Sequence, residues 1–202
     1  MALKFAVNNS LSAVTSLPTA IPTGSMTLLQ TQTASSSSSI AFTSNIDSTY
    51  DVYCFKFINC HPSANADFVF NASTDGGSNY NVTKTTTFFH AQHNEADNYT
   101  NFDYQTGNDV AQGTGDATLS RKIATGNDDA TSGEMYLFNP SSTTFVKHFM
   151  SRLKANQYIG AQYNSDNFGA GYLNTTSAVD AIRFSFASGN IDSGDIKLYG
   201  IS

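Results

Sequence analysis

Apolar and polar residues alternate with a period of two along most of the chain, which predicts β-strands rather than helices. In the segment 181–187 (AIRFSFA), Ile182, Phe184 and Phe186 are expected to face a core while polar residues face solvent. The segment 50–60 (YDVYCFKFINC) has aromatic residues at alternate positions and apolar residues between them, which predicts a central strand covered on both faces. The His-Pro pair that follows ends this strand, because proline cannot donate to the ladder.

Clusters of Gly, Asn, Asp, Ser and Pro separate further segments of strand-like composition. These further strands are expected at 26–31, 40–46, 67–71, 80–90, 99–104, 134–138, 143–153, 168–174 and 193–201. The segment 143–153 also fits a helical spacing, but its Thr-Thr-Phe-Val start favours a strand.

Two segments have the composition of connections rather than strands. The run of five serines within 34–39 predicts a linker or turn. The stretch 106–133 is dense in Gly, Asn and Asp and predicts a long surface excursion, in which 116–122 could form one helical turn. The whole pattern predicts an all-β protein: one antiparallel, jelly-roll-like β-sandwich of about 8–10 strands over residues 25–202, preceded by an N-terminal arm over residues 1–24.

The composition narrows the range of partners. Charged residues make up 13% of the chain and the net charge is −6, so no basic surface is available for nucleic-acid phosphates. No apolar run reaches the roughly 18 residues needed to span a membrane. The protein is therefore expected to bind neither nucleic acid nor membrane.

Residues 1–24 are rich in apolar side chains, yet polar residues interrupt them, so the segment lacks the apolar centre of a signal peptide. It is interpreted as a mature arm that needs a partner surface, because a short segment cannot bury its own apolar side chains. Docking on a neighbouring sheet and folding back onto its own sandwich both remain open. The residues expected to mediate assembly are Leu3, Phe5, Val7, Leu11 and Val14.

The chain offers few residues for catalysis or metal binding. His90, His93 and Glu95 form the one metal-like cluster, but side chains three apart in a strand point to opposite faces. The acidic turns lack the spacing of a calcium loop, and no nucleophile or phosphate-loop motif occurs. The only glutamates are Glu95 and Glu134, so a glycosidase pair is disfavoured. No catalytic residue, metal or cofactor is expected.

The two cysteines, Cys54 and Cys60, fall in the same predicted strand. An extended chain holds them too far apart for a disulfide, so both are expected to be free thiols packed as small apolar side chains.

Tyrosines in the second half of the chain are the candidate binding residues. Their rings could stack on sugars while neighbouring Asn, Asp and Gln side chains bind hydroxyls, or they could pack the sandwich or a subunit interface. The tyrosines concerned are Tyr99, Tyr104, Tyr158, Tyr163 and Tyr172.

Several turn and strand motifs occur in a characteristic order: Ser35–Ser39, Asp47–Asp51 (DSTYD), Tyr53–Asn59, His61-Pro62, Ser73–Tyr80, Phe138–Ser142 and Ser188–Ile201. Over residues 25–201 the chain thereby resembles small β-rich virion structural proteins, decorating or tail-associated, of tailed, chiefly marine, bacteriophages. The resemblance implies a non-enzymatic, multi-copy protein on the head or tail, assembled in the host cytoplasm with copies of itself and other virion proteins. The alternative is a carbohydrate-binding adhesin at a fibre or spike tip that recognises a host-surface glycan.

Overall fold

The computed structural model describes residues 26–202, and this part of the chain contains twelve β-strands and no helix. The strands are β1 (Met26–Ser37), β2 (Ile40–Phe42), β3 (Val52–Pro62), β4 (Ala66–Ser73), β5 (Lys84–Asn94), β6 (Thr100–Tyr104), β7 (Ala117–Ile123), β8 (Thr131–Phe138), β9 (Lys147–Tyr158), β10 (Gln162–Leu173), β11 (Ala181–Phe186) and β12 (Ile191–Ile201). The assembly residues expected in the N-terminal arm lie outside the described residues.

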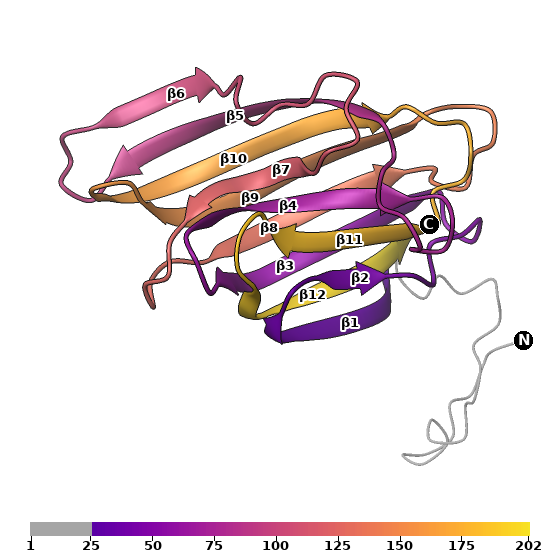
Figure 1. Cartoon of the computed structure of the whole chain (residues 1–202), viewed down its shortest axis with the longest axis horizontal. Helices are drawn as coiled ribbons and strands as arrows, with labels where there is room; N and C mark the ends of the chain where they lie inside the picture. Colours follow the sequence, from indigo (N-terminus) through magenta and orange to yellow (C-terminus); the bar gives the residue numbers. More distant parts are fainter. Residues whose placement is uncertain (1–25) are drawn as a thin grey trace, which may run out of the picture.

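The strands form two antiparallel sheets that pack face to face (Figure 1). The larger sheet has the order β1-β12-β3-β8-β9-β10-β5-β6, and the smaller sheet has the order β2-β11-β4-β7. The predicted all-β class and antiparallel β-sandwich are confirmed, with twelve strands rather than about eight to ten.

Aromatic side chains fill the space between the two sheets. The ring of Phe184 on β11 lies 5.0 Å from the rings of both Phe55 and Phe57 on β3. It also lies 6.2 Å from the rings of Phe42 and Phe68. Edge-to-face geometry predominates, and each such pair adds about 0.5–1.5 kcal/mol to the stabilisation from burial alone. The predicted alternation at 181–187 therefore corresponds to the centre of the core.

The segment with ambiguous periodicity, 143–153, is a strand from Lys147 onward, as its composition favoured. β9 alternates between buried residues such as Phe149 and Leu153 and exposed ones such as Met150 and Arg152. β9 pairs with β8 on one side and β10 on the other. Its buried and exposed residues therefore alternate with the period of two of a β-strand rather than with the period of a helix.

The prediction of a linker or turn at 34–39 was wrong for residues 34–37, and only Ser38 and Ser39 connect β1 to β2. β1 continues through the serines to Ser37, and Ser35 pairs with Ser193 of β12. Ser36 places its hydroxyl 3.3 Å from an Asp192 carboxylate oxygen on the solvent side. β1 is an edge strand, where serine side chains can face water while the backbone pairs with its single neighbour.

The prediction for 106–133 was also wrong, because this stretch contains β7 and 116–122 forms no helical turn. Leu119 and Ile123 of β7 are fully buried in the core, and the strand pairs with β4. Only two of its residues, Leu119 and Ile123, are large and apolar, so the sequence shows no clear alternation of apolar and polar residues in this segment.

β3 is a central strand, as predicted, but only one of its faces is covered. Tyr53, Phe55 and Phe57 are buried between the sheets. On the opposite face Cys54 is buried between neighbouring side chains, whereas Ile58 is 40% exposed. Coverage on both faces was therefore a wrong prediction, because no second layer lies over this side of the larger sheet within residues 26–202.

Cys54 and Cys60 lie in β3, and both are free and buried, as expected from their spacing. Burial raises the pKa of the Cys54 thiol to about 11 and that of the Cys60 thiol to about 12.

Candidate binding surface

The outer face of the larger sheet, defined as the side turned away from the smaller sheet, carries a row of charged side chains. The register places Lys56 on β3 opposite Glu134 on β8, and Glu134 opposite Arg152 on β9. Lys56 Nζ lies 3.8 Å from Glu134 Oε2. Arg152 donates two parallel bonds to Asp166 on β10, from Nη2 to Oδ2 at 2.6 Å and from Nε to Oδ1 at 3.1 Å. These bonds raise the pKa of Arg152, so the guanidinium stays charged.

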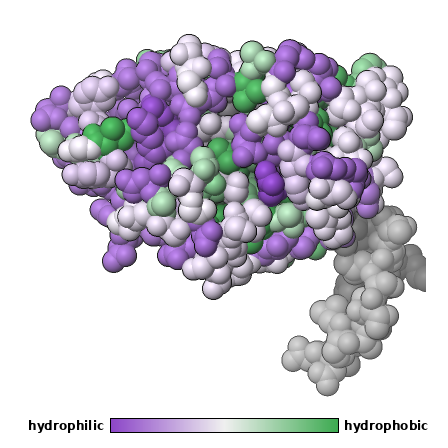
Figure 2. All heavy atoms as spheres, in the orientation of Figure 1, coloured by the Kyte–Doolittle hydropathy of each residue, from purple (hydrophilic) through white to green (hydrophobic). Residues whose placement is uncertain are grey.

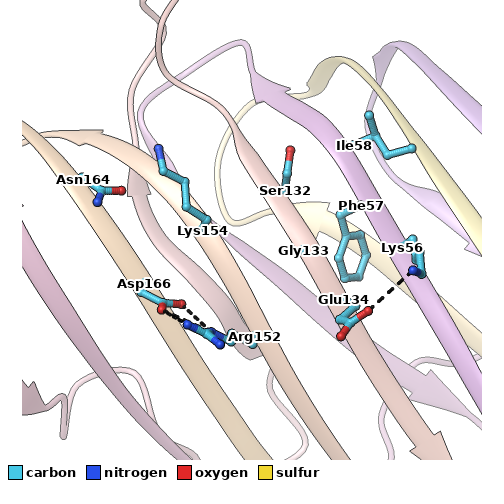
Figure 3. Close-up of a pocket in the computed structure, with 10 residues that line it drawn as sticks. All are labelled: Lys56, Phe57, Ile58, Ser132, Gly133, Glu134, Arg152, Lys154, Asn164 and Asp166. Atoms are coloured by element: carbon cyan, nitrogen blue, oxygen red, sulfur yellow. Dashed lines mark hydrogen bonds and ion pairs between the residues drawn. The ribbon is translucent and has the colours of Figure 1, made fainter.

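This row lines a shallow hollow of about 480 Å³ that spans β3, β8, β9 and β10 (Figure 3). Lys154, Asn164 and Ser132 lie toward one end of it, and Ile58 lines it from β3. Burial lowers the pKa of Lys154. The hollow thus presents hydrogen-bond donors and acceptors side by side, a mixture that suits hydroxyl groups rather than a ligand of one charge.

Aromatic side chains lie on the outer face next to the charged row. Phe168 on β10 stacks against Phe89 on β5, with centroids 4.9 Å apart and planes 4° apart. Phe89 contacts Phe102 on β6 edge-on at 5.6 Å, and Phe102 is 69% exposed. The Arg152 guanidinium lies 5.0 Å over the Phe168 ring, which joins the charged and aromatic rows into one surface.

The other end of the outer face is apolar. A second shallow hollow of about 490 Å³ is lined mainly by Phe138, Met150, Ala170 and Tyr172, together with threonines of β5. Met150 is 53% exposed. Large apolar or aromatic side chains that are exposed on the outer face are Leu28, Ile58, Phe102, Tyr104 and Met150. They are spread over the sheet from β1 to β6, and the hollow beside Met150 is where apolar side chains of the outer face adjoin one another.

The opposite side of the molecule, which carries the smaller sheet, is different (Figure 2). Hydrophilic and neutral residues cover most of that side, and hydrophobic residues appear there in small, separate areas. The outer face of the larger sheet is therefore the candidate binding surface.

The five tyrosines singled out from the sequence do not gather in one place. Tyr104 lies on the outer face opposite Phe89, and its hydroxyl donates to Asp109 at 2.6 Å. Tyr99 and Tyr163 contact each other edge-on at 5.6 Å. Tyr158 and Tyr172 lie near opposite ends of the β9–β10 hairpin. Since a strand rises about 3.3 Å per residue, those two tyrosines are roughly 30 Å apart.

The residues that do meet, chiefly Arg152, Asp166, Phe168 and Phe89, were missed by the sequence reasoning. The available signal was alternation: once β9 and β10 are placed, these residues fall opposite the buried positions. That signal does not give the register between β5, β9 and β10, and the predicted start of the last strand at residue 168 left Asp166 outside it.

The histidines of the metal-like cluster lie on opposite faces of β5, as their spacing predicted. His90 is buried and its Nε2 lies 2.8 Å from Asp103 Oδ1, while His93 is exposed and its Nε2 lies 3.0 Å from Asp97 Oδ1. Burial lowers the pKa of His90, with Arg121 acting in the same direction. Within residues 26–202, no group of three His, Cys, Asp or Glu side chains is placed to hold a metal ion.

In the same residues no helix is long and apolar enough to cross a membrane. No protein-family model, curated protein or solved structure matches the chain.

Proposed function

We propose that the chain is a non-enzymatic structural protein of a bacteriophage particle, present in many copies, and that the outer face of the larger sheet binds neighbouring copies. The observation that carries this proposal is the exposure of large apolar side chains on a sheet face that no second layer covers within residues 26–202. Met150 and Phe102 are 53% and 69% exposed. The phage context comes from the sequence motifs alone.

The energetics favour such contacts. Fully burying a Phe or Met side chain stabilises by about 1.5–3 kcal/mol, so several of them can offset much of the free energy lost on association. The charged row beside them supplies complementary pairs that fix the orientation of two subunits.

Self-association of the full chain tests this role. Light scattering on the purified protein is expected to show oligomers, and the double variant Met150→Lys/Phe102→Lys is expected to be monomeric. Phe145→Lys is the matched control, because Phe145 is 70% exposed but lies in the connection between β8 and β9. A monomeric parent protein, or equal association by all three proteins, would contradict the proposed interface.

The hollow favours a second candidate function, a carbohydrate-binding adhesin at a fibre or spike tip. Arg152, Asp166 and Asn164 offer donors and acceptors for hydroxyls, and the exposed Phe102 ring offers an apolar face for a sugar ring. Saturable binding of a host-surface polysaccharide by the parent protein, lost in Arg152→Ala but retained in Phe145→Lys, would favour the adhesin. The absence of saccharide binding in the parent protein would exclude it.

A further inference from the structure

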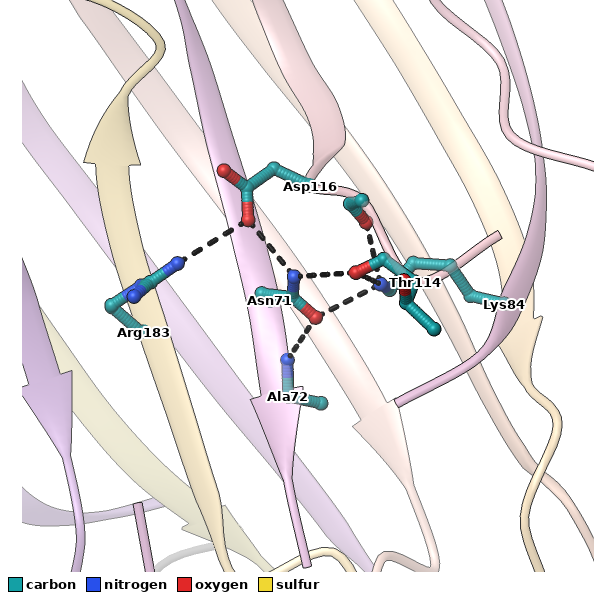
Figure 4. A network of polar contacts seen from close by, with 7 residues as sticks. Asn71, Ala72, Lys84, Thr114, Asp116 and Arg183 are labelled. Atoms are coloured by element: carbon teal, nitrogen blue, oxygen red, sulfur yellow. Dashed lines mark hydrogen bonds and ion pairs between the residues drawn. The ribbon is translucent and has the colours of Figure 1, made fainter. Parts of the chain in front are cut away.

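A fully buried lysine lies against an asparagine where the two sheets meet (Figure 4). Lys84 begins β5 of the larger sheet and has no exposed surface, while Asn71 belongs to β4 of the smaller sheet and is 3% exposed. Lys84 Nζ donates to Asn71 Oδ1 at 2.8 Å and to the backbone oxygens of Gly115 at 2.6 Å and Thr114 at 3.4 Å.

A carboxylate lies on the other side of the same amide. Asn71 Nδ2 donates to Asp116 Oδ1 at 2.9 Å and to the Thr114 carbonyl at 3.1 Å. Arg183 Nη2 lies 3.4 Å from Asp116 Oδ1 and holds that side chain from the exposed side. Lysine, amide and carboxylate therefore stand in one line, with the amide in the middle.

The surroundings of Lys84 favour the neutral amine. Burial lowers the pKa of Lys84 to about 8, although the charge of Asp116 acts against this shift. A large fraction of the side chain is then uncharged near pH 8, and a desolvated amine with a free electron pair is a nucleophile.

The amide of Asn71 is arranged to accept an attack. Its Oδ1 receives a hydrogen bond from the Ala72 backbone N–H at 2.9 Å, a donor that can stabilise negative charge developing on that oxygen. Asp116 contacts the nitrogen that would leave, and its side chain is 38% exposed, so a small leaving molecule has a route to solvent. The fold holds the reacting groups together, which removes the entropic barrier of bringing them into contact.

We propose that Lys84 and Asn71 join in an intramolecular isopeptide bond, with Asp116 as the group that holds the amide nitrogen that leaves. The neutral Nζ attacks Cγ of Asn71, the Nζ–Cγ bond forms, and the amide oxygen carries the negative charge. In this tetrahedral intermediate a proton passes from Nζ to Nδ2, and Asp116, which accepts a hydrogen bond from Nδ2, stabilises the positive charge that develops on that nitrogen. The Cγ–Nδ2 bond then breaks and ammonia leaves. The proton that Lys84 first released to solvent converts the ammonia to ammonium, so atoms and charge balance without an oxidant or cofactor.

The bond would tie the two sheets together covalently and close a loop over residues 71–84. It is independent of the proposed function, since it concerns the interior rather than the outer face. The alternative is a buried lysine that remains hydrogen-bonded and unlinked, and the two states differ by the mass of one ammonia molecule.

The intact mass of the denatured full chain distinguishes these states. We expect the parent protein, incubated at pH 8, to be lighter than its sequence by one ammonia. The variants Lys84→Arg and Asn71→Ala are expected to keep the full sequence mass, and Asp116→Asn to form the bond slowly or not at all. Lys147→Arg is the matched control: Lys147 is also fully buried, but its Nζ contacts only the carbonyls of Phe145 and Thr175, so this variant should still lose ammonia.

Tryptic digestion locates the bond. An unlinked chain is cleaved after Lys84 and gives the peptides 57–84 and 85–121, whereas a linked chain resists cleavage there and gives one peptide, 57–121, that lacks one ammonia. A parent protein of full sequence mass would overturn the proposal. So would an ammonia loss with cleavage after Lys84 retained, because that result indicates a cyclised asparagine elsewhere.

Discussion

The two buried thiols of β3 should make the protein lose stability in alkaline solution. The pKa of Cys54 rises from 9.0 to about 11 in the folded protein and that of Cys60 to about 12, mainly because of burial. Between pH 9 and pH 11 the unfolded chain therefore releases protons that the folded protein retains. A pKa raised by folding leaves stability intact below the unfolded pKa and removes it as the pH rises toward the folded pKa.

The size of this effect follows from the shifts. At pH 10 ionisation stabilises each thiol of the unfolded chain by a factor of about ten, while both thiols stay almost fully protonated in the folded protein. This corresponds to about 1.4 kcal/mol per cysteine and about 3 kcal/mol for the pair. Urea unfolding of the parent protein at pH 7 and pH 10 measures the total change, to which tyrosines and lysines also contribute. The double variant Cys54→Ala/Cys60→Ala isolates the thiols, because all other groups titrate alike in the two proteins.

The free energy of unfolding should fall by about 3 kcal/mol more in the parent than in the cysteine-free variant over this range. A constant offset between the two proteins, with parallel dependence on pH, would refute the burial of the thiols. A disulfide between Cys54 and Cys60 would do the same, since neither sulfur would then titrate.

Two substitutions test the packing. Phe184→Ala removes the central ring of the core and should destabilise the protein by about 3–5 kcal/mol in urea unfolding. Phe145→Ala, at a 70% exposed site, should change stability by less than about 0.5 kcal/mol. Similar values for the two variants would contradict the placement of Phe184 at the centre of the core. Gly133→Ala should destabilise the protein by about 2–3 kcal/mol, because the added Cβ would lie 2.3 Å from the Arg152 carbonyl oxygen. Gly107→Ala places its Cβ in open space and should be nearly neutral. Equal melting temperatures for the two variants would contradict the close approach of Gly133 to β9.

The β-sandwich could be predicted because its strands near the core keep a clean alternation. Ile182, Phe184 and Phe186 are buried as expected. The alternation of apolar and polar residues did not predict the strands that form because a neighbouring strand pairs with them despite their polar composition. The serines of β1 join the sheet because β12 supplies their hydrogen-bond partners, and β7 is recruited by β4 although its surroundings are rich in turn residues.

The candidate sites were less predictable, because each one is made by the register between strands. Arg152 and Asp166 are 14 residues apart in the sequence and meet only because β9 and β10 pair with a tight connection. Lys84, in a threonine-rich strand, has the sequence environment of a solvent-exposed residue. Its burial against Asn71 depends on the packing of one sheet on the other, which no local pattern records.

The proposed role as a multi-copy particle protein is tested most directly by counting the chain in purified phage particles. Quantitative mass spectrometry against a major capsid protein gives the copy number per particle. The chain is expected in many copies, in a fixed ratio to the capsid protein. Its absence from particles that are otherwise complete would exclude the proposed role.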